Sequence, residues 1–560
     1  MIAKVVFDLP IEGPFDYLIP PDLENVVVEG VRVKVPFGPR VAMGFVVALA
    51  AEASVPKIKV IKSLIDQKPI FDERDMMFAR QFCGYYACST GEALSLMTRH
   101  RQLPPLLSRT SQKPLTKLYH CLDGQYPVVL RDVCRPYERS FVLVPDAHMA
   151  KSLGVDIPIG LRSSMFEAFT QKQLIVVIDE DNASFKQEQS PMYESRQVLL
   201  MAQGVYGFDL VFISQTPSIE LMHLADTKCI DYERHGQVLY KPMVIDLSNY
   251  KFLDKGILSV PVRNVLEYNI KAKLQTLVFF NRRGTFSVTR CSQCGYILKC
   301  RRCDSAVSFE RGTHSFVCRQ CQERVNDPGD CPVCMVPAWK SFGMGIEKVQ
   351  KEIADLFPMA RIASFEGADE KLPAHWDVLI ATAAILRFQH TLRVATIAII
   401  DIDSALNRLD IRSSFKTWSL LGHAASMAKG MLVQTRNLEH PMIKAFGAQD
   451  DKKFYTEEAN TRQELELSPF YHWVAVVFRG KKEKNAQNLA REVYNHLKQE
   501  ELDVKITEIQ PDVPAKLRDQ HRFRLMAGGR DVSKIVAGIK RSIALSKRIS
   551  GVIITFNIDP

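Results

Sequence analysis

The sequence predicts a multidomain α/β protein. At roughly 100 to 200 residues per domain, a chain of 560 residues holds about three to five domains. Short β-branched runs alternate with helical patterns through its middle, which is typical of lobes built on parallel sheets. We therefore expect an N-terminal β-rich domain, two α/β lobes with an inserted cysteine-rich module, and a C-terminal α+β domain.

The composition is that of an ordinary globular protein. Hydrophobic residues make up 46% and charged residues 24%, which excludes wholesale disorder, a collagen-like repeat and a coiled-coil rod. The net charge of +10 favours a polyanionic partner about as much as a mildly basic enzyme. No apolar run reaches the roughly 18 residues that span a bilayer, and the start lacks a signal-peptide pattern. We expect a cytoplasmic protein with no membrane contact.

Residues 1–100 are predicted to form the β-rich domain. Proline and glycine turns separate three expected strands, and helical spacing follows them. The strands are Ile2–Leu9, Val31–Val35 and Ala42–Leu49, and the helical stretch is Glu73–Met97. Residues 101–120 are rich in proline, serine and basic side chains at their start, and we interpret them as a linker.

The two lobes are predicted at 121–255 and 256–445. Buried parallel strands are short, continuous apolar runs, and several such runs occur here with helical stretches such as Ile346–Leu356 between some of them. They are Ser140–Val144, Leu174–Ile178, Leu210–Ile213, Thr276–Phe280, Val378–Ala381 and Thr396–Ile400. The tail, 446–560, has its own strands and helices and is expected to be a separate α+β domain: Trp473–Phe478, Asn485–Glu501, Val532–Arg548 and Val552–Ile558.

Four Cys-x-x-Cys pairs lie within the insertion at 288–340. Two thiolates three positions apart can grip one tetrahedral zinc, and a second pair closes a structural site, so eight cysteines predict two Zn²⁺ ions. Lone redox motifs need one pair, not four. The pairs can be matched in three ways, and we favour the nested one: Cys291, Cys294, Cys331 and Cys334 for one zinc, and Cys300, Cys303, Cys318 and Cys321 for the other.

The segment Phe279–Gly284, followed by the eight cysteines, closely resembles the PriA family of replication restart proteins, which are superfamily 2 DNA helicases. The resemblance continues in collinear order along most of the chain. Phe15-Asp16-Tyr17 resembles the family's N-terminal domain, Val177-Ile178-Asp179-Glu180 its Walker B strand, Thr216–Glu220 its motif III, and Ser468-Pro469-Phe470 its C-terminal domain.

The resemblance implies roles for particular residues. The family's N-terminal domain binds the 3′ end of a nascent strand, and the matching positions are Phe15, Asp16, Tyr17 and Lys59. An aromatic ring can stack on a base, a carboxylate can accept from a 3′-hydroxyl, and a lysine can pair with a phosphate. Packing of both rings within the domain, with Asp16 capping a turn and Lys59 solvated, is the structural alternative.

The departures from the family lie where ATP would bind. A P-loop needs glycines and a lysine, but the corresponding stretch, 128–136, has neither. Arg387 and Phe388 replace the lysine and glycine of motif V, and 422–430, in place of motif VI, has no arginine finger. We therefore predict two degenerate RecA-like helicase lobes in which Asp179 and Glu180 are vestigial, which puts ATP and Mg²⁺ in doubt as cofactors. The family's winged-helix segment is a remnant in 101–120, or absent.

The favoured hypothesis is a pseudo-helicase that binds abandoned forks and helps to reload the replicative helicase without unwinding DNA. Forked DNA with a nascent 3′ end, primosome components, single-stranded DNA-binding protein and the replicative helicase or its loader are the implied partners, in the nucleoid-associated cytoplasm of a bacterium. One alternative is an active ATP-dependent 3′ to 5′ DNA helicase with an atypical nucleotide site. Another is a decayed remnant kept as a zinc-bearing interaction module.

Overall fold

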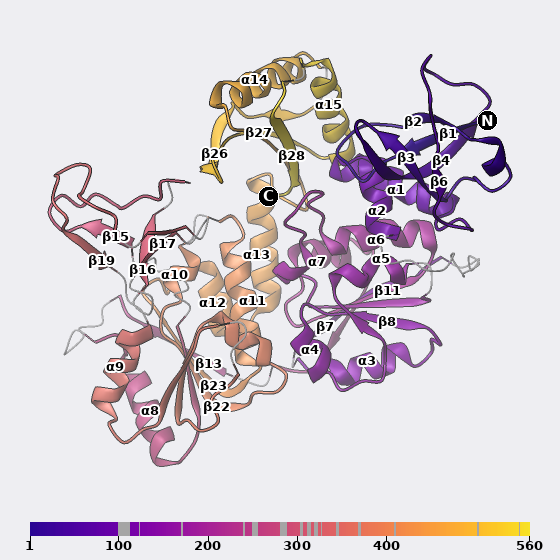
Figure 1. Ribbon diagram of the computed structural model, residues 1–560. Helices are drawn as coiled ribbons and strands as arrows, with labels where there is room; N and C mark the ends of the chain where they lie inside the picture. Colours follow the sequence, from indigo (N-terminus) through magenta and orange to yellow (C-terminus); the bar gives the residue numbers. More distant parts are fainter. Residues whose placement is uncertain are drawn as a thin grey trace.

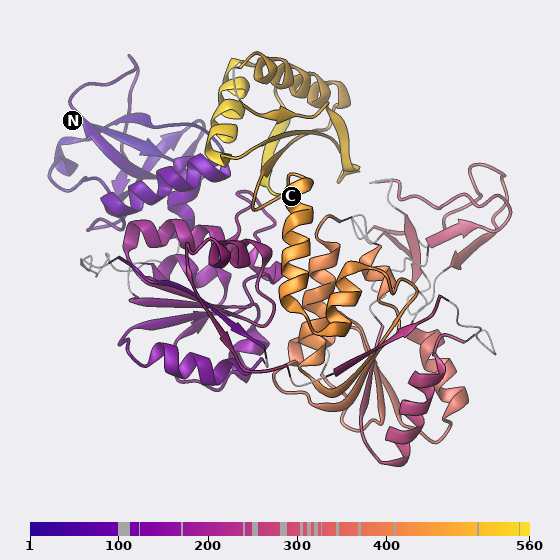
Figure 2. The same ribbon diagram turned by 180° about the vertical axis from the view of Figure 1, so that it is seen from behind.

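The computed structural model describes residues 1–98, 113–122, 124–169, 172–238, 241–248, 256–280, 288–302, 306–310, 315–318, 323–325, 327–342, 346–367, 371–407, 410–500, 503–547 and 549–560. The chain forms an N-terminal sheet domain, two parallel α/β lobes that lie side by side, a small cysteine-rich sheet and a C-terminal domain (Figures 1 and 2). The expected multidomain α/β architecture is therefore present.

The N-terminal domain is one twisted sheet in the order β5-β2-β1-β4-β3-β6. Its strands are β1 (Ile2–Val6), β2 (Phe15–Leu18), β3 (Arg32–Phe37), β4 (Arg40–Ala50), β5 (Lys59–Val60) and β6 (Ser63–Leu64). The predicted helical stretch is two helices, α1 (Glu73–Tyr86) and α2 (Thr90–Thr98), because the chain turns at Ala87 in the left-handed region. Both helices share a hydrophobic core with lobe 1.

Lobe 1 is a parallel sheet in the order β12-β7-β11-β10-β8-β9, with apolar clusters on both faces. Every strand pairs with its neighbour in parallel, as the continuous apolar runs predict. The elements are β7 (Thr116–Cys121), α3 (Tyr126–Cys134), β8 (Ser140–Leu143), α4 (Ala147–Ser152), β9 (Ile159–Gly160), α5 (Met165–Ala168), β10 (Leu174–Ile178), α6 (Ser195–Tyr206), β11 (Asp209–Ser214), α7 (Ile219–Asp226) and β12 (Asp231–His235).

Lobe 2 repeats this plan with the order β13-β23-β22-β14-β21-β20. Helices α8 and α9 share the core of one face, and α11, α12 and α13 share that of the other. The elements are β13 (Lys241–Asp246), α8 (Val260–Lys271), β14 (Thr276–Phe279), α9 (Ile346–Leu356), β20 (Ile362–Phe365), β21 (Val378–Ala381), β22 (Val394–Ile399), α10 (Asp403–Leu406), α11 (Ser413–Ala425), β23 (Ala428–Thr435), α12 (Pro441–Ala448) and α13 (Asp451–Glu464).

The cysteine-rich module follows β14, as predicted, and forms an antiparallel sheet in the order β18-β17-β16-β15-β19. Its strands are β15 (Val288–Cys291), β16 (Val307–Glu310), β17 (Ser315–Cys318), β18 (Arg324–Val325) and β19 (Trp339–Phe342). The module lies beside lobe 2, away from lobe 1 (Figures 1 and 2).

The C-terminal domain is the predicted α+β unit. Its antiparallel sheet has the order β25-β27-β24-β28, with β26 paired to β27, and two helices cover one face (Figure 1). The elements are β24 (His472–Gly480), α14 (Glu483–Gln499), β25 (Lys505–Ile506), β26 (Gln510–Leu517), β27 (Gln520–Gly529), α15 (Val532–Leu545) and β28 (Val552–Ile558). Lys540 of α15 donates to Glu12 and to the carbonyl of Cys88, so this domain also contacts the N-terminal one.

Three predicted domain boundaries need correction. The linker was expected to reach residue 120, but β7 is already a central strand of the lobe 1 sheet. Strand β13 was assigned to lobe 1 and pairs with β23 in lobe 2. Lobe 2 was expected to end at 445, whereas Phe454 and Tyr455 of α13 belong to its core. Residues 99–112, most of the expected linker, lie outside the described ranges.

Candidate functional site

The four residues predicted to hold a DNA 3′ end line one pocket of about 280 Å³ at the edge of the N-terminal sheet. Strand β2 carries Phe15, Asp16 and Tyr17, and Lys59 lies opposite Tyr17 in the parallel pair of β2 and β5. We call this the N-terminal pocket, and its other walls include Pro36, Phe37, Ser54 and Lys57. A small β-sheet domain thus gathers aromatic, acidic and basic groups at one concave surface.

Asp16 is the most constrained of these groups. Its carboxylate accepts hydrogen bonds from Lys4 Nζ at 2.7 Å, from the Ser54 amide at 2.5 Å and from Ser54 Oγ at 2.6 Å. Lys4 stands directly across the strand pair from Asp16. The hydrogen bond from Lys4, with those from Ser54, lowers the pKa of Asp16 to about 2. The side chain is therefore an ionised acceptor that also anchors the loop at Ser54.

The other three residues differ in exposure. Tyr17 is buried, and its hydroxyl donates to the carbonyl of Pro36 at 3.0 Å, so its ring packs within the domain. Phe15 is half-buried and packs against Phe37 with a ring separation of 5.8 Å. Lys59 is exposed. Phe15 and Lys59 are thus available to a ligand, while Tyr17 has the packing role of the alternative hypothesis.

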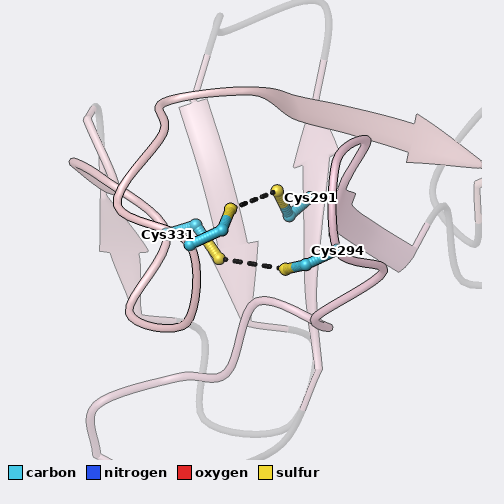
Figure 3. A group of neighbouring side chains, drawn as sticks. Cys291, Cys294 and Cys331 are labelled. Atoms are coloured by element: carbon cyan, nitrogen blue, oxygen red, sulfur yellow. Dashed lines mark hydrogen bonds between the residues drawn. The ribbon is translucent and has the colours of Figure 1, made fainter.

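Four of the predicted zinc ligands form one candidate metal centre. The sulfurs of Cys291, Cys294, Cys331 and Cys334 all lie within 4.8 Å of one another. Cys291 and Cys334 are 3.5 Å apart, as are Cys294 and Cys331, and Figure 3 shows Cys291 and Cys294 facing Cys331 from the opposite side of the site. The structure thus brings together the two outer pairs of the nested match.

Both pairs are held by the same backbone turn. The amide of Gly295 donates to the carbonyl of Cys291 at 3.0 Å, and the amide of Met335 donates to that of Cys331 at 2.8 Å. Gly295 and Met335 both have positive φ, 77° and 56°. A hydrogen bond from the Cys294 amide lowers the pKa of Cys291 to about 7, whereas burial and the sulfurs of Cys291 and Cys294 raise the pKa of Cys334 to about 12. The two turns thus present four sulfurs to a common centre.

The second predicted set is described in part. Cys300 and Cys318 are buried in one small cluster with Val307, which pairs with Cys318 across β16 and β17. The amide of Arg302 points at the sulfur of Cys300 at 3.4 Å. Cys303 and Cys321 lie outside the described residues. Cys300 and Cys318, one from each inner pair of the nested match, therefore lie in the same small cluster.

Asp179 and Glu180 follow β10 directly, at the carboxyl edge of the lobe 1 sheet. Both are buried, and protein groups occupy part of each carboxylate. Tyr126 donates to Asp179 Oδ1 at 2.5 Å, and Gln389 of lobe 2 donates to Asp179 Oδ2 at 3.2 Å. The Ser218 amide donates to Glu180 Oε1 at 2.8 Å. The predicted acidic pair is thus engaged in contacts within and between the lobes.

The next residue, Asp181, completes a row of three carboxyl groups with little solvent. Burial raises the pKa of Glu180 to about 7. Burial, together with the charges of Glu180 and Asp179, raises the pKa of Asp181 well above its usual range. Ser419 of α11 donates to Asp181 Oδ2 at 2.9 Å. Side chains of both lobes therefore meet at this point of the cleft.

The stretch predicted to stand in place of the phosphate loop is mostly helical. Residues 128–136 lie in helix α3 and just beyond it. The connection between β7 and α3 is 122–125, where Gly124 has a positive φ of 65°. This connection reads Leu-Asp-Gly-Gln and has no lysine. Tyr126, the first residue of α3, places its hydroxyl on Asp179 and also accepts from the Gln215 amide at 3.0 Å.

Sequence reasoning missed the residues that bridge the lobes. Gln389 lies in the segment interpreted as a degraded motif V, and His423 in that interpreted as motif VI. Thr216 contacts Ser419 at 3.0 Å and His423 Nε2 at 3.3 Å. The only signal in the sequence was that Gln389 and His423 each lie in a segment that departs from the family's motif.

Among the described helices, none is long and apolar enough to cross a membrane.

A family model described as the 3′ DNA-binding domain of PriA matches residues 4–99. The chain is 24% identical to the replication restart protein PriA of Rickettsia conorii, over 100% of this chain and 99% of the relative. It is 25% identical to PriA of Bacillus subtilis and 28% identical to PriA of Chlamydia pneumoniae, over 70% and 72% of this chain. The matches cover 52% and 58% of those two relatives, so they span little more than half of their length.

Among solved structures, the chain is similar to Saccharomyces cerevisiae Dbp5 bound to RNA and ADP BeF3, with a TM-score of 0.28 and 10% identity over 66% of this chain and 85% of the other. It is also similar to the Escherichia coli DEAH/RHA helicase HrpB, with a TM-score of 0.31 and 11% identity over 58% and 41%. These likenesses are too slight to define a shared fold.

Proposed function

Because the chain belongs to the PriA family of replication restart proteins, we propose that it binds abandoned replication forks through the N-terminal pocket and promotes reloading of the replicative helicase. The observation that carries this proposal is the grouping of Phe15, Asp16 and Lys59 at one concave edge of the 3′ DNA-binding domain. A ring for the terminal base, an acceptor for the 3′-hydroxyl and a cation for the adjacent phosphate suit a strand end.

We propose that the protein performs this task without unwinding DNA. Phosphoryl transfer depends on positioned cations and a phosphate-wrapping loop. Here the β7 to α3 connection has no lysine, and Asp179 accepts from Tyr126 and Gln389 instead. An atypical ATP-dependent helicase is the competing function. The proposal thus assigns the two lobes a scaffold role between the DNA-binding domain and the cysteine-rich module.

The cysteine-rich module is proposed to bind two structural Zn²⁺ ions and to help recruit primosome partners. Closed tetrahedral thiolate sites hold small sheets together and leave no open position for catalysis. The geometry of the first set and the burial of Cys300 and Cys318 support this assignment. Single-stranded DNA-binding protein and the replicative helicase or its loader remain the partners that family membership suggests.

The experiment that tests fork recognition compares two forks that differ only at the leading-strand end. Wild-type protein should bind a 3′-hydroxyl fork at least about tenfold more tightly than a 3′-phosphate fork, because the phosphate sets a negative charge against Asp16. Asp16→Asn, which keeps an acceptor but removes the charge, should erase most of this preference. Fluorescence anisotropy at fixed salt measures both affinities.

Lys59→Ala should weaken both forks alike, because the lysine is assigned to a backbone phosphate. Lys68→Ala is the matched control, since Lys68 is an exposed lysine of the same domain that does not line the pocket. Equal affinity of the wild-type protein for the two forks would contradict end recognition and leave only attraction to the DNA backbone.

A further inference from the structure

Three potential metal ligands meet between the lobes, away from the cysteine-rich module. A carboxylate oxygen of Asp179, one of Asp181 and a ring nitrogen of His423 lie within 4.8 Å of one another. The two aspartates follow β10 of lobe 1, and His423 lies near the end of α11 in lobe 2. We call these residues the inter-lobe cluster. In Figures 1 and 2 the α11 and α13 side of lobe 2 faces lobe 1.

Several atoms at this cluster are buried without a hydrogen-bond partner. Within the described residues, Asp181 Oδ1, His423 Nδ1 and the neighbouring Glu180 Oε2 have none. His423 is only 9% exposed. A buried polar atom without a partner costs about 1 to 3 kcal/mol, and more when charged. Three such atoms at the meeting point of two lobes therefore indicate a missing ligand, not a finished polar core.

The charge balance of the cluster favours a cation. Neutral side chains donate to both aspartates: Tyr126, Ser214 and Gln389 to Asp179, and Ser419 to Asp181. Arg196 faces Glu180, but it pairs with Glu194 at 2.9 Å and with Glu220 at 3.5 Å. A divalent ion would join the carboxylates and would occupy the free lone pairs.

The donor set indicates which kind of ion fits. Mg²⁺ and Ca²⁺ prefer oxygen ligands alone, whereas an imidazole with two carboxylates suits Zn²⁺, Mn²⁺ or Fe²⁺ and leaves positions open. A cavity of about 280 Å³ adjoins the cluster, with Asp181, Ser419 and His423 on the cluster side. Its other walls carry charges of both signs, from Arg196, Arg412, Lys416, Arg462, Glu194 and Glu220. The cavity provides space for water at the open positions of the ion.

We propose that Asp179, Asp181 and His423 bind one divalent transition-metal ion that joins the two lobes without a nucleotide. The lobe 1 carboxylates supply charge, and the lobe 2 imidazole makes binding conditional on the closed arrangement of the lobes. Metal binding then stabilises that arrangement by mass action. The site is distinct from the cysteine centre in ligand type and in place, and it does not depend on fork recognition.

The test uses the full chain loaded with only two equivalents of Zn²⁺, which the thiolates bind first, so that added Mn²⁺ meets oxygen and nitrogen ligands. Electron paramagnetic resonance follows the loss of the free Mn²⁺ signal. Wild-type protein should bind about one Mn²⁺ with no ATP present. Asp181→Asn and His423→Ala should each weaken binding by at least about tenfold, since losing a ligand costs no less than losing its supporting group. His375→Ala, at an exposed histidine of lobe 2, should not change it.

Thermal unfolding separates a ligand from a merely structural residue. Asp181→Asn keeps an acceptor for Ser419 in a side chain of nearly the same size, so its metal-free Tm should equal or exceed that of the wild type while its Mn²⁺-dependent rise disappears. A lower metal-free Tm with an unchanged rise would overturn the proposal. Three other results would also overturn the proposal. They are equal Mn²⁺ affinity in the wild type and both variants, no binding to the wild type at millimolar Mn²⁺, and binding that requires ATP.

Discussion

Tyr126→Phe should destabilise lobe 1 although it removes only one oxygen atom. The hydroxyl is fully buried, donates to Asp179 Oδ1 at 2.5 Å and accepts from the Gln215 amide at 3.0 Å. A hydrogen bond to a charged group contributes about 1.5 to 3 kcal/mol, and a buried amide left without an acceptor costs about 1 to 3 kcal/mol. Because the ring still fills its place, no cavity term is added.

The expected loss is therefore about 2 to 4 kcal/mol, allowing for the Ser214 hydroxyl that also lies 3.5 Å from Asp179 Oδ1. For a lobe of this size the transition should shift down by at least about 5 °C. Scanning calorimetry measures the shift, and hydrogen exchange should show faster exchange at the Gln215 amide. Fork affinity should not change, because the N-terminal pocket is separate.

Tyr137→Phe is the matched control for this prediction. Tyr137 lies in the same lobe and donates to Asp209 Oδ2 at 2.7 Å, but it is only partly buried, and among the described residues no backbone amide donates to its hydroxyl. Its loss should cost about 1 kcal/mol or less, since water can replace the phenol. Equal and small shifts for the two variants would refute the reasoning that Tyr126 holds the strand ends around Asp179 together.

Three further predictions follow from the sites. Cys331→Ser should lower the zinc content by about one equivalent, and a chelator should unfold the module while the lobes stay folded; elemental analysis showing unchanged zinc would count against the centre. DNA should not stimulate phosphate release from ATP, and robust release abolished by Asp179→Asn would reverse the scaffold assignment. The stability advantage of wild type over Asp16→Asn should be full above about pH 4 and should vanish toward pH 2. The pKa of Asp16 is about 2 in the folded protein and 3.8 ordinarily. A group whose pKa is lowered by folding stabilises the protein above its unfolded pKa, and this stabilisation is lost as the pH falls through the folded pKa. Melting curves from pH 5 to pH 2 measure the difference between the two proteins.

Strands buried on both faces could be predicted from the sequence. Leu174–Ile178 and Val378–Ala381 are β10 and β21 with the bounds expected, because a parallel strand in the middle of a sheet is a continuous apolar run. Strand β12 was missed because Asp231–His235 is an exposed edge strand with polar side chains. The break between α1 and α2 was missed because Ala87 adopts a left-handed conformation without a glycine to mark it.

Of the two candidate metal sites, one could be predicted from the sequence and the other could not. The cysteine centre could be predicted because the ligand type and the spacing within each pair already fix the local turn, and nesting leaves the outer pairs to meet. The inter-lobe cluster could not, because His423 and Asp181 are 242 positions apart and meet only through the packing of two separately folded lobes. Pairing across such a distance depends on tertiary geometry, which no local pattern encodes.

The segments interpreted as degraded motifs meet at one place in the fold, between the two lobes. The sequence shows each departure from the family pattern separately and does not reveal this. Gln389, from the motif V segment, reaches Asp179, while Thr216, from the motif III segment, contacts His423 of the motif VI segment. In an ATP-driven helicase such groups must exchange partners as nucleotide binds and leaves. Here they hydrogen-bond to one another across the cleft, so opening the cleft would break buried contacts. This arrangement favours lobes that hold one relative position, and such a platform suits a protein whose proposed task is to present a fork end to its partners.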